Sequence, residues 1–184
     1  MRRTTTAAVA LAVAGTGLVG TAGTAGAAPA ATSCSARWGS GLKTVPDSTG
    51  KPLKNIRTGR NTCYDRMVFD VTGPAGRTGY HVSYVTKFRQ DGSGTPIPVA
   101  GGAVLQVVVN APSYDPATAK PVYPGRAGKP LPGVDVKGYR TFKDTKFGAS
   151  YEGQTQVGVG VRARLPFRVL QSGDKLIVDV AHTW

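Results

Sequence analysis

The sequence is poor in the side chains that most often carry out chemistry. Its 184 residues include two histidines, His81 and His182, and a single glutamate, Glu152. A zinc hydrolase draws its ligands and its base mainly from such residues, and no His-Glu-x-x-His pattern is present to supply them. A Gly-x-Ser-x-Gly nucleophile elbow is missing as well. These absences argue against an enzyme and against a protein-bound metal, and no pattern indicates a cofactor.

Long apolar runs are equally scarce, and one lies at the very start of the chain. Ala7–Leu18 is a run of apolar and small residues that follows two arginines, and it falls short of the roughly 20 residues that a membrane span needs. Ala25-Gly26-Ala27 then provides the small residues that signal peptidase prefers. We therefore expect residues 1–27 to be a cleavable secretory signal and residues 28–33 to be a small-residue spacer. The pattern predicts a secreted, extracellular or wall-associated protein with no transmembrane span.

Acidic residues are few beside the basic ones. Once Arg2 and Arg3 leave with the signal, 21 basic and 10 acidic residues remain, a net charge of +11. Such a charge attracts polyanions over long range. Outside a cell the polyanions at hand are wall polymers, teichoic-type phosphates and anionic lipids, so nucleic acid is not an expected partner. The charge can equally serve solubility alone, and composition does not separate these two interpretations.

Cysteine occurs twice, at Cys34 and Cys63. An even number of cysteines in an exported chain indicates a disulfide. The bond would close a loop of about 30 residues and stabilise the fold by about 3–4 kcal/mol. A catalytic thiol is the alternative, and it is disfavoured because no histidine lies in a nearby motif.

Helical periodicity is absent over any stretch of about ten residues, whereas two-residue alternation recurs from Tyr64 onward. The segments with strand patterns are 64–72, 80–88, 103–109, 157–161, 167–169 and 176–180. Turn residues separate them, and Ser172-Gly173-Asp174 is typical of a hairpin turn. A short strand is also expected at 36–38. The pattern predicts a single all-β domain over residues 34–184, an antiparallel β-sandwich of two packed sheets.

Two longer-range features bear on how such strands are arranged. Residues 110–133 contain six prolines and predict a long loop that crosses between the halves of the fold, either as a functional loop or as a solvated insertion. Val68-Phe69-Asp70-Val71 resembles Ile177-Val178-Asp179-Val180. This echo suggests two pseudo-symmetric strands, one in each of the packed sheets.

Arginines and aspartates gather around the second cysteine. Arg57, Arg60 and Arg66 lie close in sequence to Asp65 and Asp70. A buried arginine–aspartate pair would hold the fold together through bidentate hydrogen bonds. Exposed guanidinium groups would instead bind a carboxylate or phosphate of a ligand. Both interpretations stay open at this point.

The same segment carries a resemblance to a known family. Asn55-Ile56-Arg57-Thr58-Gly59-Arg60, followed by Cys63-Tyr64-Asp65-Arg66 and Val68-Phe69-Asp70, resembles the AMIN-like domain family of secreted proteins and lipoproteins. The resemblance continues through Gly79-Tyr80, Tyr84-Val85, Gly94–Val99, Leu105–Val107, Glu152–Thr155, Gly158–Val161, Pro166–Val169 and Leu176–Val180. It also includes Trp38-Gly39-Ser40, so it covers nearly all of the mature chain.

This resemblance implies a binding role rather than an activity. AMIN domains proper look like two small packed β-sheets that localise cell-wall amidases and secretins on peptidoglycan, and the AMIN-like relatives have no established activity or catalytic residues. By fold-level analogy, this chain is expected to be a non-catalytic extracellular domain that binds peptidoglycan or an anionic wall polymer. A secreted protein-interaction module, such as an inhibitor or assembly factor, is the alternative.

Binding to a wall polymer would use aromatic faces together with cationic side chains. The candidate binding residues are Arg57, Arg60, Tyr64, Arg66, Tyr139 and Tyr151, with Tyr114 and Tyr123 as further aromatic candidates. The strand face that carries Gly158 and Gly160 could admit a sugar ring, or it could let another part of the chain pack closely.

Overall fold

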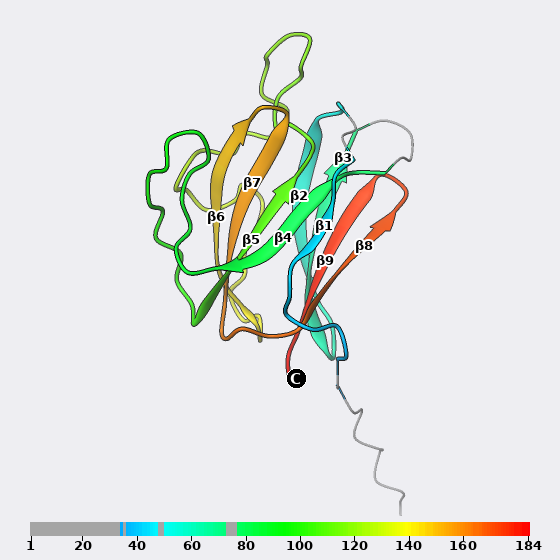
Figure 1. The fold of residues 1–184 in the computed structure, drawn as a ribbon, viewed down its shortest axis with the longest axis vertical. Coiled ribbons are helices and arrows are strands. Elements are labelled where there is room, and N and C mark those ends of the chain that lie inside the picture. The colour runs from blue at the N-terminus through cyan, green and yellow to red at the C-terminus, as the bar shows by residue number, and fades with distance from the viewer. Residues whose placement is uncertain (1–33, 35, 48–49, 73–76) are drawn as a thin grey trace, which may run out of the picture. The chain divides into compact units, whose positions relative to one another are not determined.

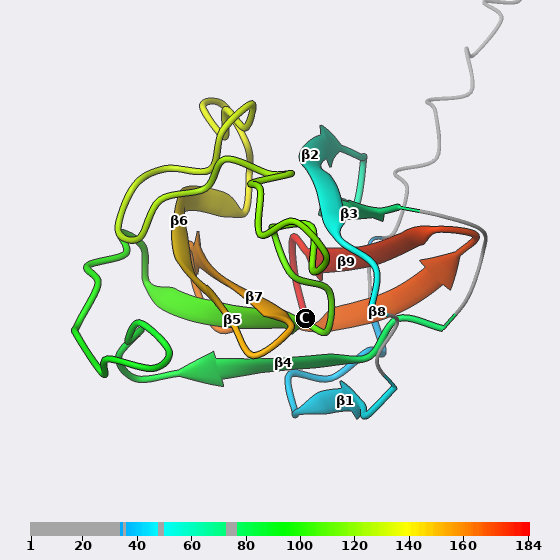
Figure 2. The same cartoon turned by 90° about the horizontal axis from the view of Figure 1, so that it is seen from above.

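The structure, a computed structural model, describes residues 34, 36–47, 50–72 and 77–184. Within these residues the regular elements are nine β-strands arranged in two sheets, and no helix occurs among them. The two sheets pack face to face (Figures 1 and 2), which confirms the predicted β-sandwich. The expected export signal and spacer, residues 1–33, lie outside the described residues.

The larger sheet has five strands in the order β1-β4-β5-β7-β6. They are β1 (Lys43–Val45), β4 (Tyr80–Val85), β5 (Ala103–Val109), β7 (Gln154–Val161) and β6 (Phe142–Tyr151). The smaller sheet has four strands in the order β2-β3-β9-β8. They are β2 (Leu53–Arg60), β3 (Tyr64–Val71), β9 (Lys175–Ala181) and β8 (Phe167–Ser172). All neighbouring strands pair antiparallel, and the predicted turn at 172–174 joins β8 to β9.

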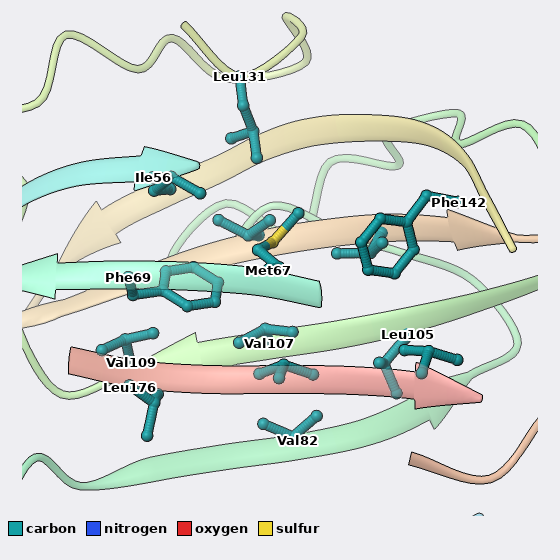
Figure 3. Packing of buried hydrophobic residues seen from close by; sticks show 14 of the residues in the cluster. Ile56, Met67, Phe69, Val82, Leu105, Val107, Val109, Leu131, Phe142 and Leu176 are labelled. Atoms are coloured by element: carbon teal, nitrogen blue, oxygen red, sulfur yellow. The ribbon is translucent and has the colours of Figure 1, made fainter. Parts of the chain in front are cut away.

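Apolar side chains that alternate along the strands fill the space between the sheets. Met67 and Phe69 of β3 and Leu176 of β9 point inward from the smaller sheet and are fully buried. Figure 3 shows them facing the buried side chains of the larger sheet, among them Val107 and Phe142. Burial of side chains of this size contributes about 1.5–3 kcal/mol each to folding, so this layer supplies the main stabilisation of the domain.

Three strands, β1, β2 and β6, were not predicted by alternation. β2 is an edge strand that buries only Leu53 and Ile56, so most of its residues are polar and no apolar alternation marks it as a strand. β6 is also an edge strand, and two register shifts break its alternation. The short strand expected at 36–38 is wrong, because Arg37 and Trp38 lie in a turn.

The echo between residues 68–71 and 177–180 does not relate the two sheets. The two segments belong to β3 and β9, which pair antiparallel in the smaller sheet, with Val68 opposite Ile177. The prediction of mates in separate sheets is therefore wrong. The segments look alike because both are central strands of one sheet, and each places an aspartate, Asp70 or Asp179, on its outer face.

The segment between β4 and β5, residues 86–102, folds over the outer face of the larger sheet. The ring of Phe88 lies so close to Gly158 that a Cβ atom there would be 2.8 Å from it. The carbonyl of Ala100 covers Gly160 in the same manner. The side-chain amide of Gln156 donates to the Arg89 carbonyl at 2.9 Å and holds the segment in place. The glycines thus allow close packing, and this face offers no open platform for a sugar ring.

The proline-rich segment lies along the seam between the edge strands β2 and β6 (Figure 2). Leu53 donates its N–H to the Pro112 carbonyl at 2.7 Å, which ties the segment to β2. Tyr123 and Leu131 are only 3 % and 2 % exposed and belong to the core. Burial raises the pKa of Tyr123, whose hydroxyl donates to Pro132. The segment therefore closes the sandwich and is not a solvated insertion, and Tyr123 cannot present its ring to a ligand.

Because Phe88 packs closely on Gly158, a methyl group added at Gly158 should destabilise the fold, whereas one added at an open glycine should not. Gly158→Ala should lower the free energy of unfolding by about 1–3 kcal/mol, because the ring must move away. Gly59→Ala is the matched control: Gly59 also lies in a strand, and nothing stands within 4 Å of its Cβ position. It should leave stability unchanged or slightly raised. Denaturant unfolding measures both variants, and equal stabilities would contradict the packing described here.

Candidate functional site

The structure does not bring the six candidate binding residues together. Tyr64 and Arg66 lie side by side on the outer face of the smaller sheet, with the guanidinium 5.2 Å from the ring centre. Arg60 and Tyr139 form a second group, 5.7 Å apart, where β2 ends. Arg57 lies on the same outer face as Arg66, opposite Val68, where it pairs with Asp70, and Tyr151 lies at the far end of β6.

Arg66 is held by an aspartate that sequence proximity did not indicate. It donates from Nε and Nη2 to the two carboxylate oxygens of Asp179, at 2.6 and 2.9 Å. Arg168 donates a further hydrogen bond to the same carboxylate at 2.9 Å. Asp179 is fully buried, and its hydrogen bonds raise the pKa of Arg66. Arg66 thus compensates a buried charge across β3, β9 and β8, and its role here is structural.

Arg57 forms a similar bidentate ion pair with Asp70, but a more exposed one. Its guanidinium donates to both carboxylate oxygens of Asp70, at 3.0 and 3.2 Å, and these bonds raise the pKa of Arg57. The side chain of Arg57 is 49 % exposed, so this ion pair is largely screened by solvent. Asp65 forms no ion pair with any arginine that the structure describes. Its Oδ2 accepts the N–H groups of Thr141 and Phe142 at 2.6 and 3.1 Å.

An aromatic and cationic cluster covers the outer end of the smaller sheet. The guanidinium of Arg168 lies 4.3 Å from the ring of Trp38 and 5.3 Å from that of Tyr64. Trp38 and Tyr64 meet edge to face at 5.7 Å. Arg168 and Trp38 thus occupy the surroundings of the Tyr64 ring. These contacts fix the segment around Trp38 to β3 and β8.

The disulfide between Cys34 and Cys63 fastens the same segment covalently, as the sequence predicts. It joins the start of the domain to the turn between β2 and β3. The hydroxyl of Thr183 donates to the Cys34 carbonyl, and the N–H of His182 donates to the Cys63 carbonyl, both at 2.9 Å. The two ends of the domain therefore meet at one end of the sandwich, where the letter C stands in Figure 1.

Four exposed cations surround this end of the sandwich: Arg60, Arg140, Lys143 and Arg162. Arg140 donates to the Thr62 carbonyl at 3.5 Å, Lys143 to the Tyr139 carbonyl at 3.2 Å, and Arg162 to the His182 carbonyl. Among the described residues, none of the four forms an ion pair with a carboxylate. We call this set the cationic end.

Two carboxylates near the cationic end, those of Asp65 and Asp179, are turned inward. Asp65 is 1 % exposed, and its Oδ1 lies 3.9 Å from Nε2 of the buried His182. Asp179 is fully buried beneath its two arginines. The positive charge at the surface is therefore not cancelled by these two residues, and the cationic end is suited to hold an anion from outside.

The candidate tyrosines differ in what they offer a ligand. Tyr139 stacks on Phe142 with a centre-to-centre distance of 5.8 Å, and its hydroxyl hydrogen-bonds Thr58 at 3.0 Å. One face of its ring therefore packs on Phe142 and the guanidinium of Arg60 lies near the ring, so little of the ring is open to a ligand. Tyr151 is 50 % exposed at the end of β6, just before the turn to β7, and the neighbouring Glu152 raises its pKa. Because β6 separates Tyr139 from Tyr151, a compact ligand cannot contact both.

The described part of the chain holds no group of three or more metal-ligating side chains. In that same part, no helix has the length and apolar character of a membrane span.

The ion pairs of Asp179 and Asp70 should differ in their contribution to the free energy of unfolding, because Asp179 is more deeply buried. Asp179→Asn should lower the free energy of unfolding by about 3 kcal/mol, because two guanidinium groups lose their shared counter-charge. Asp70→Asn, at the equivalent outer position of β3, should cost under about 1 kcal/mol, because its partner is half exposed. Chemical denaturation compares the two variants. A larger loss for Asp70→Asn would overturn this assignment.

The disulfide makes a separate prediction. Thiol titration of the denatured, unreduced protein should find no free thiol. Replacing both cysteines by serine should lower the free energy of unfolding by about 3 kcal/mol, because the open chain gains entropy on unfolding. Two titratable thiols in the secreted protein would contradict the bond.

Comparison with known proteins agrees with this architecture. No curated protein and no solved structure matches the chain. A model of one protein family, the AMIN-like domain, matches residues 51–182, a stretch that runs from the start of β2 to the end of β9. The chain belongs to the AMIN-like domain family.

Proposed function

We propose that this chain is a non-catalytic secreted domain that binds an anionic cell-wall polymer, such as peptidoglycan or a phosphate-bearing wall polymer, through its cationic end. The observation that carries the proposal is the gathering of Arg60, Arg140, Lys143 and Arg162 at one end, each held by a carbonyl or a ring instead of a carboxylate. Membership of the AMIN-like domain family supports a wall-related role.

Preorganisation favours this site over the other arginines of the chain. Guanidinium groups that already rest on protein acceptors lose little side-chain entropy when an anion arrives. They also keep further N–H donors for bidentate contacts with carboxylate or phosphate. Arg66 and Arg168, by contrast, already share the carboxylate of Asp179. Binding of an anion at the cationic end therefore displaces no internal ion pair.

The disulfide supports the export that this function requires. Disulfides form and persist in oxidising compartments, outside the cell or in its envelope. We propose accordingly that residues 1–27 are removed as a secretory signal and that the domain begins near Ala28.

Sedimentation with purified, insoluble wall polymer tests the proposal. Wild-type protein should co-sediment at low salt, and the bound fraction should fall steeply toward about 0.5 M salt, because exposed charges are screened beyond a few ångströms there. The triple variant Arg60→Gln, Arg140→Gln and Lys143→Gln should lose most low-salt binding while it stays folded by circular dichroism.

A matched control separates the cationic end from net charge alone. The triple variant Lys54→Gln, Arg77→Gln and Lys120→Gln removes the same charge from exposed positions at the opposite end of the sandwich. It should retain most of the binding. Equal loss in both variants would reject a localised site, and a folded wild type that does not sediment even at low salt would favour the protein-interaction alternative.

A further inference from the structure

A groove lies beside the cationic end, where β4 and β5 separate. Tyr84–Thr86, Val99, Gly101–Val104 and Arg164 line it, and its volume is about 450 Å³. A second hollow of about 240 Å³ continues it along Phe88 and Pro96–Val99 and shares Thr86, Val99 and Val104 with it. Sites for small ligands usually enclose about 300–1,000 Å³, so the groove has the size of a binding site for a short peptide.

The walls of this groove are already fixed in place. Phe88 and Ile97 are 3 % and 7 % exposed, and the Ile97 N–H donates to the Phe88 carbonyl at 3.0 Å. On the other side, Gly101 adopts a φ of 142°, and a Cβ atom at Gly102 would stand 2.2 Å from the Arg162 carbonyl. Only glycine permits this close approach, so the wall at these positions consists of backbone. Such a groove needs no rearrangement before a ligand enters.

Arg164 marks one end of the groove, and the exposed Lys87 lines the hollow that continues it. The guanidinium of Arg164 lies 5.2 Å from the ring centre of Tyr84, whose hydroxyl is fixed by hydrogen bonds to the backbone of Leu165 at 2.9 and 3.0 Å. Two nitrogens of Arg164 donate to Ser40, each at 3.3 Å. A guanidinium carries five N–H donors, so others stay available for a carboxylate. Along the rest of the groove, Pro96, Pro98 and Val99 offer apolar surface.

We propose that this groove binds the peptide stem of the wall polymer, with the terminal carboxylate of the peptide on Arg164 and its small apolar side chains against Pro96–Val99. The proposal rests on the proposed function with peptidoglycan as the polymer, because peptidoglycan, unlike a phosphate-bearing wall polymer, carries short, alanine-rich peptide stems that end in a carboxylate. Glycan is a poorer match to the groove. Sugars stack on open aromatic faces, whereas Tyr84 is partly buried, meets Phe167 edge to face at 5.7 Å and lies under Arg164.

Isothermal titration with soluble peptides tests this assignment. The probe is an acetylated Ala-Lys-D-Ala-D-Ala peptide with a free carboxylate, compared with its C-terminal amide and with the all-L sequence. The acid should bind at least about tenfold more tightly than the amide, because the amide loses the charge-assisted hydrogen bond. Equal binding of acid and amide would overturn the role of Arg164. Binding of the all-L peptide alone would replace the wall peptide by a protein C-terminus.

Variants locate the contact within the groove. Arg164→Gln should weaken binding of the acid by about tenfold. Arg126→Gln, which removes an equal charge from an exposed position of the proline-rich segment, should not. Thr86 is exposed in the groove wall, so Thr86→Asp should weaken binding by repulsion while Thr86→Lys preserves it. The opposite response of two variants at one position separates charge from misfolding. If both lysine and aspartate at this position leave binding unchanged, the groove is not the site.

The two proposals fail independently. If the peptide does not bind while wild-type protein still sediments with the polymer at low salt, the groove assignment is wrong and the cationic end stands. If the peptide binds and the Arg60, Arg140 and Lys143 variant sediments as well as wild type, the groove stands and the cationic end is wrong.

Discussion

The buried carboxylate of Asp179 divides the arginines of this domain into two groups. Arg66 and Arg168 are bound to it and tie β3, β9 and β8 together on the outer face of the smaller sheet. A carboxylate at that depth must be fully compensated, so these arginines are committed to the fold. Arg60 and Arg140 rest on neutral groups instead, and they form part of the cationic end. The positive charge of the cationic end thus depends on which arginines the buried carboxylates bind.

The end of the sandwich where this division occurs is also its most cross-linked part. The Cys34–Cys63 bond, the contacts of Trp38 with Arg168, and the hydrogen bonds of the buried His182 all converge there. Cross-links of this density limit motion of the backbone that carries the cations. A rigid array of charges suits a repetitive polymer, because each anionic group meets a site that is already formed.

Alternation in the sequence was sufficient to predict the central strands, and resemblance was sufficient to predict the family. β3, β4 and β9 each direct alternate side chains into the core, so their period of two is visible in the chain itself, whereas β5 is visible as a short apolar run. The edge strands β2 and β6 were not predicted, because burial does not impose alternation on them. β2 buries only two side chains, and β6 changes register twice. The proline-rich segment looked like solvent-exposed chain, yet Tyr123 and Leu131 complete the core along the open seam.

By itself the sequence determined the fold class, the disulfide partners and the surplus of positive charge, since these follow from local pattern, from two cysteines and from composition. Only the tertiary structure decided which arginine meets which aspartate. Arg66 lies next to Asp65 in the chain, but in a strand neighbours point to opposite faces, so Arg66 meets Asp179, 113 residues away, while Asp65 turns into the core. Among the residues that the structure describes, the cations of the cationic end form no ion pair with a carboxylate.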